Sequence, residues 1–137
     1  MKLSHIPLRL TIGAFVLNSG LSKRNLDPQT AKGIHAMAAG AVPPLARLDP
    51  QQFGTLLSTG EIALGVALML PIVPSAVAGA GLTAFGAALT QLYLKTPGMR
   101  EPGSLRPTQQ GTAIAKDVWL VGAGLTLLLD REHRSDD

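Results

Sequence analysis

The chain has 137 residues, of which 46% are hydrophobic and 15% charged, and its formal net charge is +3. This is the length of one domain, and the absence of cysteine excludes thiol–disulfide exchange, thiolate metal sites and iron–sulfur ligation within the chain. The charges are clustered and leave long stretches nearly free of them, which favours a membrane protein.

Four runs are long enough to cross a bilayer, which needs roughly 20 mostly apolar residues per helix. They cover residues 3–21, 53–70, 75–94 and 112–129. A soluble domain of this size has too little interior to hide four such helices from water. We therefore expect an all-α fold, a single membrane domain over residues 1–137 that forms a four-transmembrane-helix bundle and ends in a polar tail at 130–137.

The first run contains a charge at Arg9 and follows a short basic start, as a secretory signal would. However, Arg9 lies inside the apolar stretch, and no small-x-small cleavage pattern precedes Lys23. A retained helix is therefore the favoured interpretation. In the loop that follows, residues 22–52, the stretch 29–41 has loosely helical spacing before Pro43 and Pro44 stop it. It is either a short helix lying in the membrane interface or an irregular loop.

The second and third runs are separated only by residues 71–74, so we expect them to be antiparallel helices that pack together. In the third run, Gly79, Thr83, Gly86 and Thr90 recur at helical spacing. Small residues let membrane helices approach closely, so these four predict a face that packs against a neighbouring helix.

The loop at residues 95–111 is rich in Pro and Gly, which indicates irregular structure. Lys95, Arg100 and Arg106 make it basic, so it is expected to meet anionic headgroups or the acidic surface of a partner. The two long loops carry seven Lys and Arg residues against three on the termini. This favours cytoplasmic loops. Nucleic acid is not expected, because the basic residues border apolar spans and aromatic residues are few.

Charges inside the spans are the only candidate chemistry. A carboxylate such as Glu61, near the middle of the second run, is costly in lipid and needs a partner or a task. Arg9, Glu61, Lys116 and Asp117 sum to zero, so they can be buried together.

We expect Glu61 to accept hydrogen bonds from Lys116, from Arg9 or from both. Ser58 would add a hydroxyl donor from one turn earlier. Asp117 would meet Lys23 or Arg24 at the membrane edge.

This charge cluster has two interpretations. It either locks the helices in register, or it forms a polar pocket for a quinone headgroup or another small amphipathic ligand. In the second case Glu61 accepts a proton, and Arg9 or Lys116 holds a carbonyl oxygen. The three histidines lie outside the run centres, so the pattern does not favour bis-histidine haem, and no spacing suggests a metal.

An early arginine in the first run followed by GAFVLNSGLSK, then GEIALGVALMLP and AKDVWLVGAGLTLLL, resembles the DoxX-like family of small bacterial membrane proteins. The resemblance covers nearly the whole chain, and TPGMREPGS with RPTQQG is similar to an actinobacterial type. The distinctive residues are Arg9, Gly20, Lys23, Gly60, Glu61, Lys116 and Asp117.

The resemblance implies a four-helix bundle in the bacterial plasma membrane that serves as an accessory subunit or partner in quinone-linked or other redox systems. Our first hypothesis is thus a non-catalytic subunit of a larger redox, respiratory or cell-envelope complex, with no cofactor of its own. The second is a quinone-binding component that uses Arg9, Glu61 and Lys116. The third is a conduit for small solutes or protons, for which a homo-oligomer would be needed.

Overall fold

The computed structural model describes residues 2–96, 98–109 and 111–130, so the predicted tail from residue 131 onward lies outside the described residues. The regular structure of the described residues is helical, apart from an isolated antiparallel bridge between Arg100 and Pro107. This confirms the all-α prediction. The elements in chain order are η1 (Leu3–His5), α1 (Ile6–Ser22), α2 (Pro28–Ala41), η2 (Pro43–Arg47), α3 (Pro50–Met69), α4 (Ser75–Lys95), α5 (Thr112–Ala115) and α6 (Val118–Leu129).

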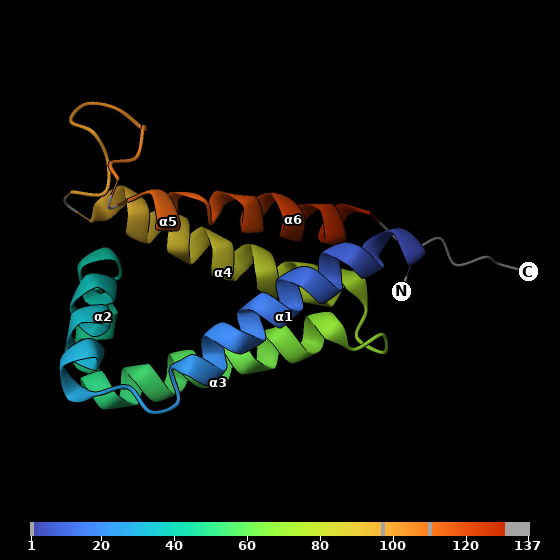
Figure 1. Cartoon of the computed structure of the whole chain (residues 1–137), viewed down its shortest axis with the longest axis horizontal. Helices are drawn as coiled ribbons and strands as arrows, with labels where there is room; N and C mark the ends of the chain where they lie inside the picture. Colours follow the sequence, from blue (N-terminus) through green and yellow to red (C-terminus); the bar gives the residue numbers. More distant parts are fainter. Residues whose placement is uncertain (1, 97, 110, 131–137) are drawn as a thin grey trace, which may run out of the picture.

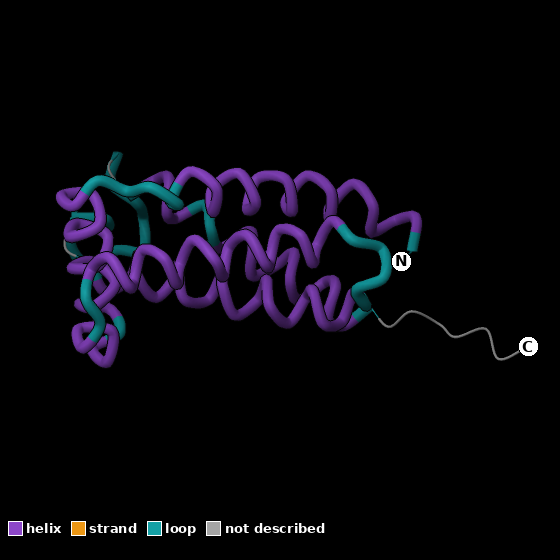
Figure 2. Tube along the Cα trace, turned by 90° about the horizontal axis from the view of Figure 1, so that it is seen from below, coloured by secondary structure: helices purple, strands orange, loops and turns teal. Residues whose placement is uncertain are grey.

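The long helices α1, α3, α4 and α6 lie roughly along the longest axis of the molecule and alternate in direction. The helix α2 lies across them at one end (Figure 1, Figure 2). We call one end of the molecule the turn end, where α1 begins, the turn between α3 and α4 lies and α6 finishes. The opposite end, with α2 and the loop between α4 and α5, is the loop end. The helices form two pairs, α1 with α3 and α4 with α6. The pairs converge at the turn end and diverge toward the loop end (Figure 1).

Close backbone approach at glycine builds the α1–α3 pair. A Cβ atom on Gly65 of α3 would lie 2.6 Å from the backbone nitrogen of Leu17, and one on Gly20 of α1 would lie 2.8 Å from that of Ile62. Real Cβ contacts are not this short, so these positions accept only glycine without a shift of the helices. The two glycines thereby fix how α1 and α3 are aligned.

The α4–α6 pair is built in the same way. A Cβ atom on Gly79 would lie 2.7 Å from the carbonyl oxygen of Gly124, and one on Gly86 would lie 2.8 Å from the backbone nitrogen of Val121. Gly79 and Gly86 belong to the small face predicted from the sequence, so the prediction that this face packs against a neighbouring helix is confirmed. Its neighbour is α6, the helix formed by the fourth run.

Contact between α3 and α4 is much more limited than the prediction of a packed hairpin required. They share the apolar cluster of Leu68, Ala78, Leu82 and Leu127, which also includes α6. Pro71 follows the end of α3 and Pro74 precedes the start of α4, but the turn between them does not hold the two helices together along their length. A short connection fixes only where two helices meet, whereas the small residues decide which helices lie close together.

Residues 29–41, for which the sequence allowed either a short helix or an irregular loop, are helical and belong to α2. Asp27 caps α2 by accepting a hydrogen bond from the backbone of Thr30 at 3.3 Å, and Pro28 occupies the first helical position. At its other end, the carbonyl of Ala41 accepts hydrogen bonds from Gln91 and Lys95 of α4. Since α2 also contacts α3, it bridges the two pairs where they diverge.

Two helices, α3 and α4, are long and apolar enough to cross a membrane. The fourth predicted run is not one continuous helix, because α5 and α6 are separated by a turn at Lys116 and Asp117. At this turn, hydrogen bonds from Asp117 to Ile114 and from Trp119 to Lys116 span three residues instead of four. Large apolar side chains such as those of Leu3, Ile72 and Trp119 remain exposed.

Candidate functional site

Glu61 is paired with Lys23, not with Arg9 or Lys116. The Nζ atom of Lys23 lies 3.0 Å from Oε2 and 3.2 Å from Oε1 of Glu61. Only 4% of the Glu61 side chain and 20% of the Lys23 side chain are exposed. The expected pairing was therefore wrong, although both residues had been singled out.

The α1–α3 alignment explains the pairing. A Cβ atom on Gly20 would touch Cβ of Glu61, so the backbone of α1 passes directly beside that residue. Lys23 follows Gly20 at the end of α1, and its flexible stem reaches back to the carboxylate. The Oγ atom of Ser19, one turn earlier, accepts a second bond from Lys23 Nζ at 2.6 Å. Ser58 does not join the pair, because its hydroxyl donates to the carbonyl of Gly20 at 2.7 Å.

Arg9 lies at the turn end and binds backbone carbonyls. It is fully buried, with Nε donating to Leu68 at 2.8 Å and Nη2 donating to Ala67 at 2.9 Å and to Leu70 at 3.0 Å. These carbonyls close α3, and the last carbonyls of a helix have no partners within it. Arg9 thus caps α3 with a positive charge at the negative end of the helix dipole. The expectation that it shares a cluster with Glu61 was wrong.

Lys116 and Asp117, which lie at the turn between α5 and α6, have different surroundings. Lys116 is exposed, and in the part of the chain that the structure describes its side chain makes no hydrogen bond or ion pair. Asp117 is half-buried and close enough to Glu61 for the two carboxylates to repel each other. Its expected pairing with Lys23 or Arg24 is wrong, because Lys23 binds Glu61 and Arg24 is exposed.

A second polar network ties the chain ends together at the turn end. His5 is buried, with Nδ1 3.0 Å from Ser75 Oγ and Nε2 2.7 Å from Oδ2 of Asp130. Lys2 donates to Oδ1 of the same carboxylate at 2.7 Å. These bonds, the one from Lys2 first and that from His5 second, lower the pKa of Asp130. Since an ionised carboxylate only accepts, the imidazole donates to Asp130 through Nε2, and in the neutral ring Nδ1 accepts from Ser75.

Serine, histidine and aspartate in contact invite comparison with a hydrolytic triad. Here Ser75 is 1% exposed, and its Oγ accepts a hydrogen bond from Nη1 of Arg9 at 3.2 Å. A nucleophile must reach its substrate, whereas this hydroxyl is enclosed and engaged on both sides. The network therefore joins η1, α4 and the end of α6, and its role is structural.

A cavity of about 510 Å³ lies between the two helix pairs. Its polar lining consists of Ser19, Lys23, Glu61 and Asp117, and the rest is apolar. Most of the apolar lining comes from α1 to α4 and includes Phe15, Ile34, Phe53 and Phe85. Leu45, Ile114 and Leu120 add to it from η2, α5 and α6. Binding sites for small organic molecules have this size and this mainly apolar lining with a few polar groups. The Lys23–Glu61 pair therefore forms one polar spot on an apolar cavity.

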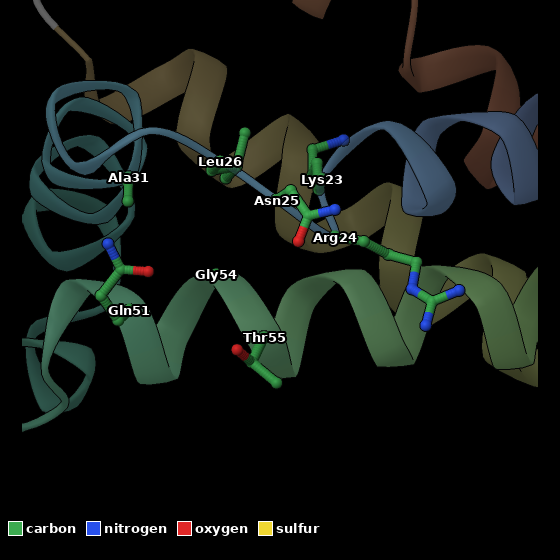
Figure 3. Close-up of a pocket in the computed structure, with 8 residues that line it drawn as sticks. All are labelled: Lys23, Arg24, Asn25, Leu26, Ala31, Gln51, Gly54 and Thr55. Carbon is green, nitrogen blue, oxygen red and sulfur yellow. The ribbon is translucent and has the colours of Figure 1, made fainter.

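A smaller pocket of about 230 Å³ lies on the other side of Lys23, between the connection from α1 to α2 and the first half of α3 (Figure 3). In Figure 3 the Arg24 side chain extends along α3, and Asn25 and Gln51 face the hollow from opposite sides. The pocket is mostly polar and lined by Lys23, Arg24, Asn25, Leu26, Ala31, Gln51, Gly54 and Thr55. It has no apolar wall comparable with that of the larger cavity.

The three basic residues of the second long loop lie at the loop end, and two of them contact backbone. Lys95 reaches the carbonyl of Ala41 at 3.4 Å, and Arg100 donates to the carbonyl of Leu94 at 2.9 Å. Arg106 is exposed. Among residues 2–96, 98–109 and 111–130, no group of three or more His, Asp or Glu side chains could hold a metal ion.

Sequence reasoning missed the apolar lining, His5, Ser75 and Asp130. The signal for the lining was available, because the three phenylalanines of the chain lie on three different helices and all face the cavity. No family model, curated protein or solved structure matches this chain.

Proposed function

We propose that this protein is a small membrane-embedded binding subunit that holds a small, mainly apolar molecule between its two helix pairs. The observation that carries the proposal is the cavity of about 510 Å³ with Lys23 and Glu61 in its wall. Lys23 holds Glu61 in place, and the Glu61 carboxylate can accept a hydrogen bond from a polar group of the ligand. The apolar walls would take the remaining surface of the ligand, where most of the binding free energy arises.

The proposed protein crosses the membrane four times. The segment formed by η1 and α1 rises about 30 Å, and α5 with α6 about 27 Å, at 1.5 Å per helical residue. Both lengths approach the thickness of the hydrocarbon core. The exposed apolar side chains of α1 and α6, such as Leu10 and Leu129, support this proposal because lipid would cover them.

Orientation follows from the arrangement of the basic residues. Both long connections lie at the loop end, which carries Lys23, Arg24, Arg47, Lys95, Arg100 and Arg106. We place this end in the cytoplasm, at the inner face of the bacterial plasma membrane, because positive loops are retained there. The same residues would meet anionic lipid headgroups.

The accessory role and the DoxX-like membership implied by the sequence motifs belong to the same proposal. Gly60 on α3 and Gly122 on α6 are exposed, and nothing lies within 4 Å of a Cβ atom built on either. Such positions let a helix of another subunit approach closely. Extraction in a gentle detergent followed by affinity capture should recover a partner that carries a flavin, haem or other redox centre. Capture of this chain alone would contradict the accessory role.

The binding role is tested by filling the cavity. Ala88 lines it, whereas the neighbouring Ala87 on the same helix does not, and both alanines are exposed. Native mass spectrometry of protein extracted from its membranes should detect one bound small molecule in the wild type and in Ala87→Phe. Ala88→Phe should lose it. An empty wild-type protein, or equal occupancy in the two variants, would overturn the proposal.

A further inference from the structure

We propose that the ligand of the cavity is an organic cation with a mainly apolar body, and that Asp117 is its counter-ion. This inference rests on the proposed binding function and names the ligand class. It depends on two features of the wall, its net charge and the kind of aromatic residue it contains.

The charged residues that line the cavity are one lysine and two carboxylates, Lys23, Glu61 and Asp117. The lysine is already used, since its Nζ bonds both oxygens of Glu61 and Oγ of Ser19. Asp117 makes no side-chain hydrogen bond or ion pair with any residue that the structure describes. In its ionised form Asp117 therefore gives the wall one uncompensated negative charge.

Among the residues that the structure describes, no basic side chain other than Lys23 lines the cavity. Lys116 is adjacent to Asp117 in sequence, but it is exposed and does not line the cavity. Asp117 also lies close to Glu61, which makes its environment more negative. An ionised carboxylate at an apolar wall costs free energy unless an opposite charge meets it or it takes up a proton. A cationic ligand would supply that charge, while a neutral quinone would not.

The aromatic residues of the wall favour the same ligand class. All three phenylalanines of the chain, Phe15, Phe53 and Phe85, line the cavity, while Tyr93 and Trp119 do not. Phenylalanine has no hydrogen-bonding group, so its only polar contribution is the negative face of its ring. Such faces attract cations within about 6 Å, and the attraction is stronger where water is excluded. The three rings come from α1, α3 and α4 and so surround the space from different sides.

Two ions of nearly equal size and opposite charge test the inference directly. Tetraphenylphosphonium and tetraphenylborate are both apolar spheres with a central unit charge. We would measure their binding to the full chain in a nonionic detergent by isothermal titration calorimetry. The wild-type protein should bind the phosphonium at least about tenfold more tightly than the borate. The wall charge attracts the cation and repels the anion, and at an apolar wall this effect exceeds the free energy that corresponds to a tenfold ratio of affinities. Equal affinities, or tighter binding of the borate, would overturn the inference.

Variants separate the role of Asp117 from a general effect of charge. Asp117→Asn should weaken phosphonium binding at least about tenfold and should not weaken borate binding. Glu101→Gln removes the same charge from the exposed loop and should change neither affinity. Phe85→Leu should weaken phosphonium binding roughly two- to thirtyfold through loss of the ring face. If Asp117→Asn weakens both ions equally, or if Glu101→Gln has the same effect, Asp117 is not the counter-ion.

Failure of this inference can be told from failure of the binding role. If the borate binds as well as the phosphonium and Ala88→Phe abolishes both, the cavity is a binding site without preference for cations. If neither ion binds and the wild-type protein carries no native occupant, both proposals fail. Should Asp117→Asn not fold, the comparison of the two ions on the wild-type protein still decides the ligand class.

Discussion

The ion pair between Lys23 and Glu61 makes a quantitative prediction, because its two members differ in burial. We would replace each residue by a neutral one of similar shape, as Lys23→Met, Glu61→Gln and the double variant. Glu61→Gln leaves an ammonium that can extend its stem toward water, since 20% of the Lys23 side chain is exposed. Lys23→Met leaves a carboxylate that is only 4% exposed and has no such route. Lys23→Met should therefore be the more damaging change.

The distance between the Lys23 ammonium and the Glu61 carboxylate sets the size of the expected loss of stability. At the observed 3.0 Å, two unit charges attract by about 5 kcal/mol with an effective dielectric constant of about 20. The cost of removing both groups from water offsets part of this. We expect Lys23→Met to lower the free energy of unfolding by about 3 kcal/mol and Glu61→Gln to lower it by about 2 kcal/mol. The double variant should lose about 2 kcal/mol less than the sum of the two.

Unfolding in mixed detergent micelles, followed by circular dichroism, measures these free energies. Lys116→Met serves as the matched control, because Lys116 is exposed and makes no side-chain bond among the described residues. This variant should stay within about 0.5 kcal/mol of the wild type. Additive losses for Lys23 and Glu61, or a larger coupling between Glu61 and Lys116, would show that the pairing described here is incorrect.

Three further changes test other parts of the fold, each by the same unfolding measurement. Arg9→Lys should lower the free energy of unfolding by about 3 kcal/mol, because an ammonium cannot replace the planar guanidinium that binds three carbonyls at the end of α3. A loss under about 1 kcal/mol would argue against this cap. Gly65→Ala should cost about 1 to 3 kcal/mol by forcing α1 away from α3, whereas Gly60→Ala, which meets open space, should be neutral or slightly stabilising. Because the pKa of Asp130 is lowered, its ionised form adds stability above its ordinary value of 3.8, and this stability is lost as pH falls through the lowered pKa. Asp130→Asn should therefore flatten the dependence of melting temperature on pH below about 5, and an unchanged acid profile would contradict the network at the turn end.

The sequence predicts the helices well because run length and proline positions are local signals. The structured segments α3 and α4 begin and end within three residues of the predicted runs, where Pro50, Pro71 and Pro74 mark the boundaries. The turn at Lys116 and Asp117 escaped prediction, because those two residues are compatible with a continuous helix. Only the hydrogen bonds that span three residues reveal it.

The partners of the buried charges could not be predicted from charge balance. That reasoning assigns each cation to an anion, whereas Arg9 is satisfied by carbonyl oxygens that every helix end provides. A usable signal was Pro71, because the proline that ends α3 leaves its last carbonyls without helical donors. For Lys23, the signal lay in Ser19 and Gly20, which place a small surface and a second hydrogen-bonding group on the same side of α1.

Small residues lie between the helices of each pair and larger residues lie between the two pairs, and this distribution explains where the cavity lies. Gly20 and Gly65 bring the backbones of α1 and α3 into close contact, and Gly79 and Gly124 do the same for α4 and α6. Between the pairs the facing residues are large, the three phenylalanines among them, and they contact each other less closely. Two tightly closed pairs that meet at one end must leave room at the other, and α2 covers that end without filling it. The cavity therefore follows from the same residue pattern that selects the helix pairs.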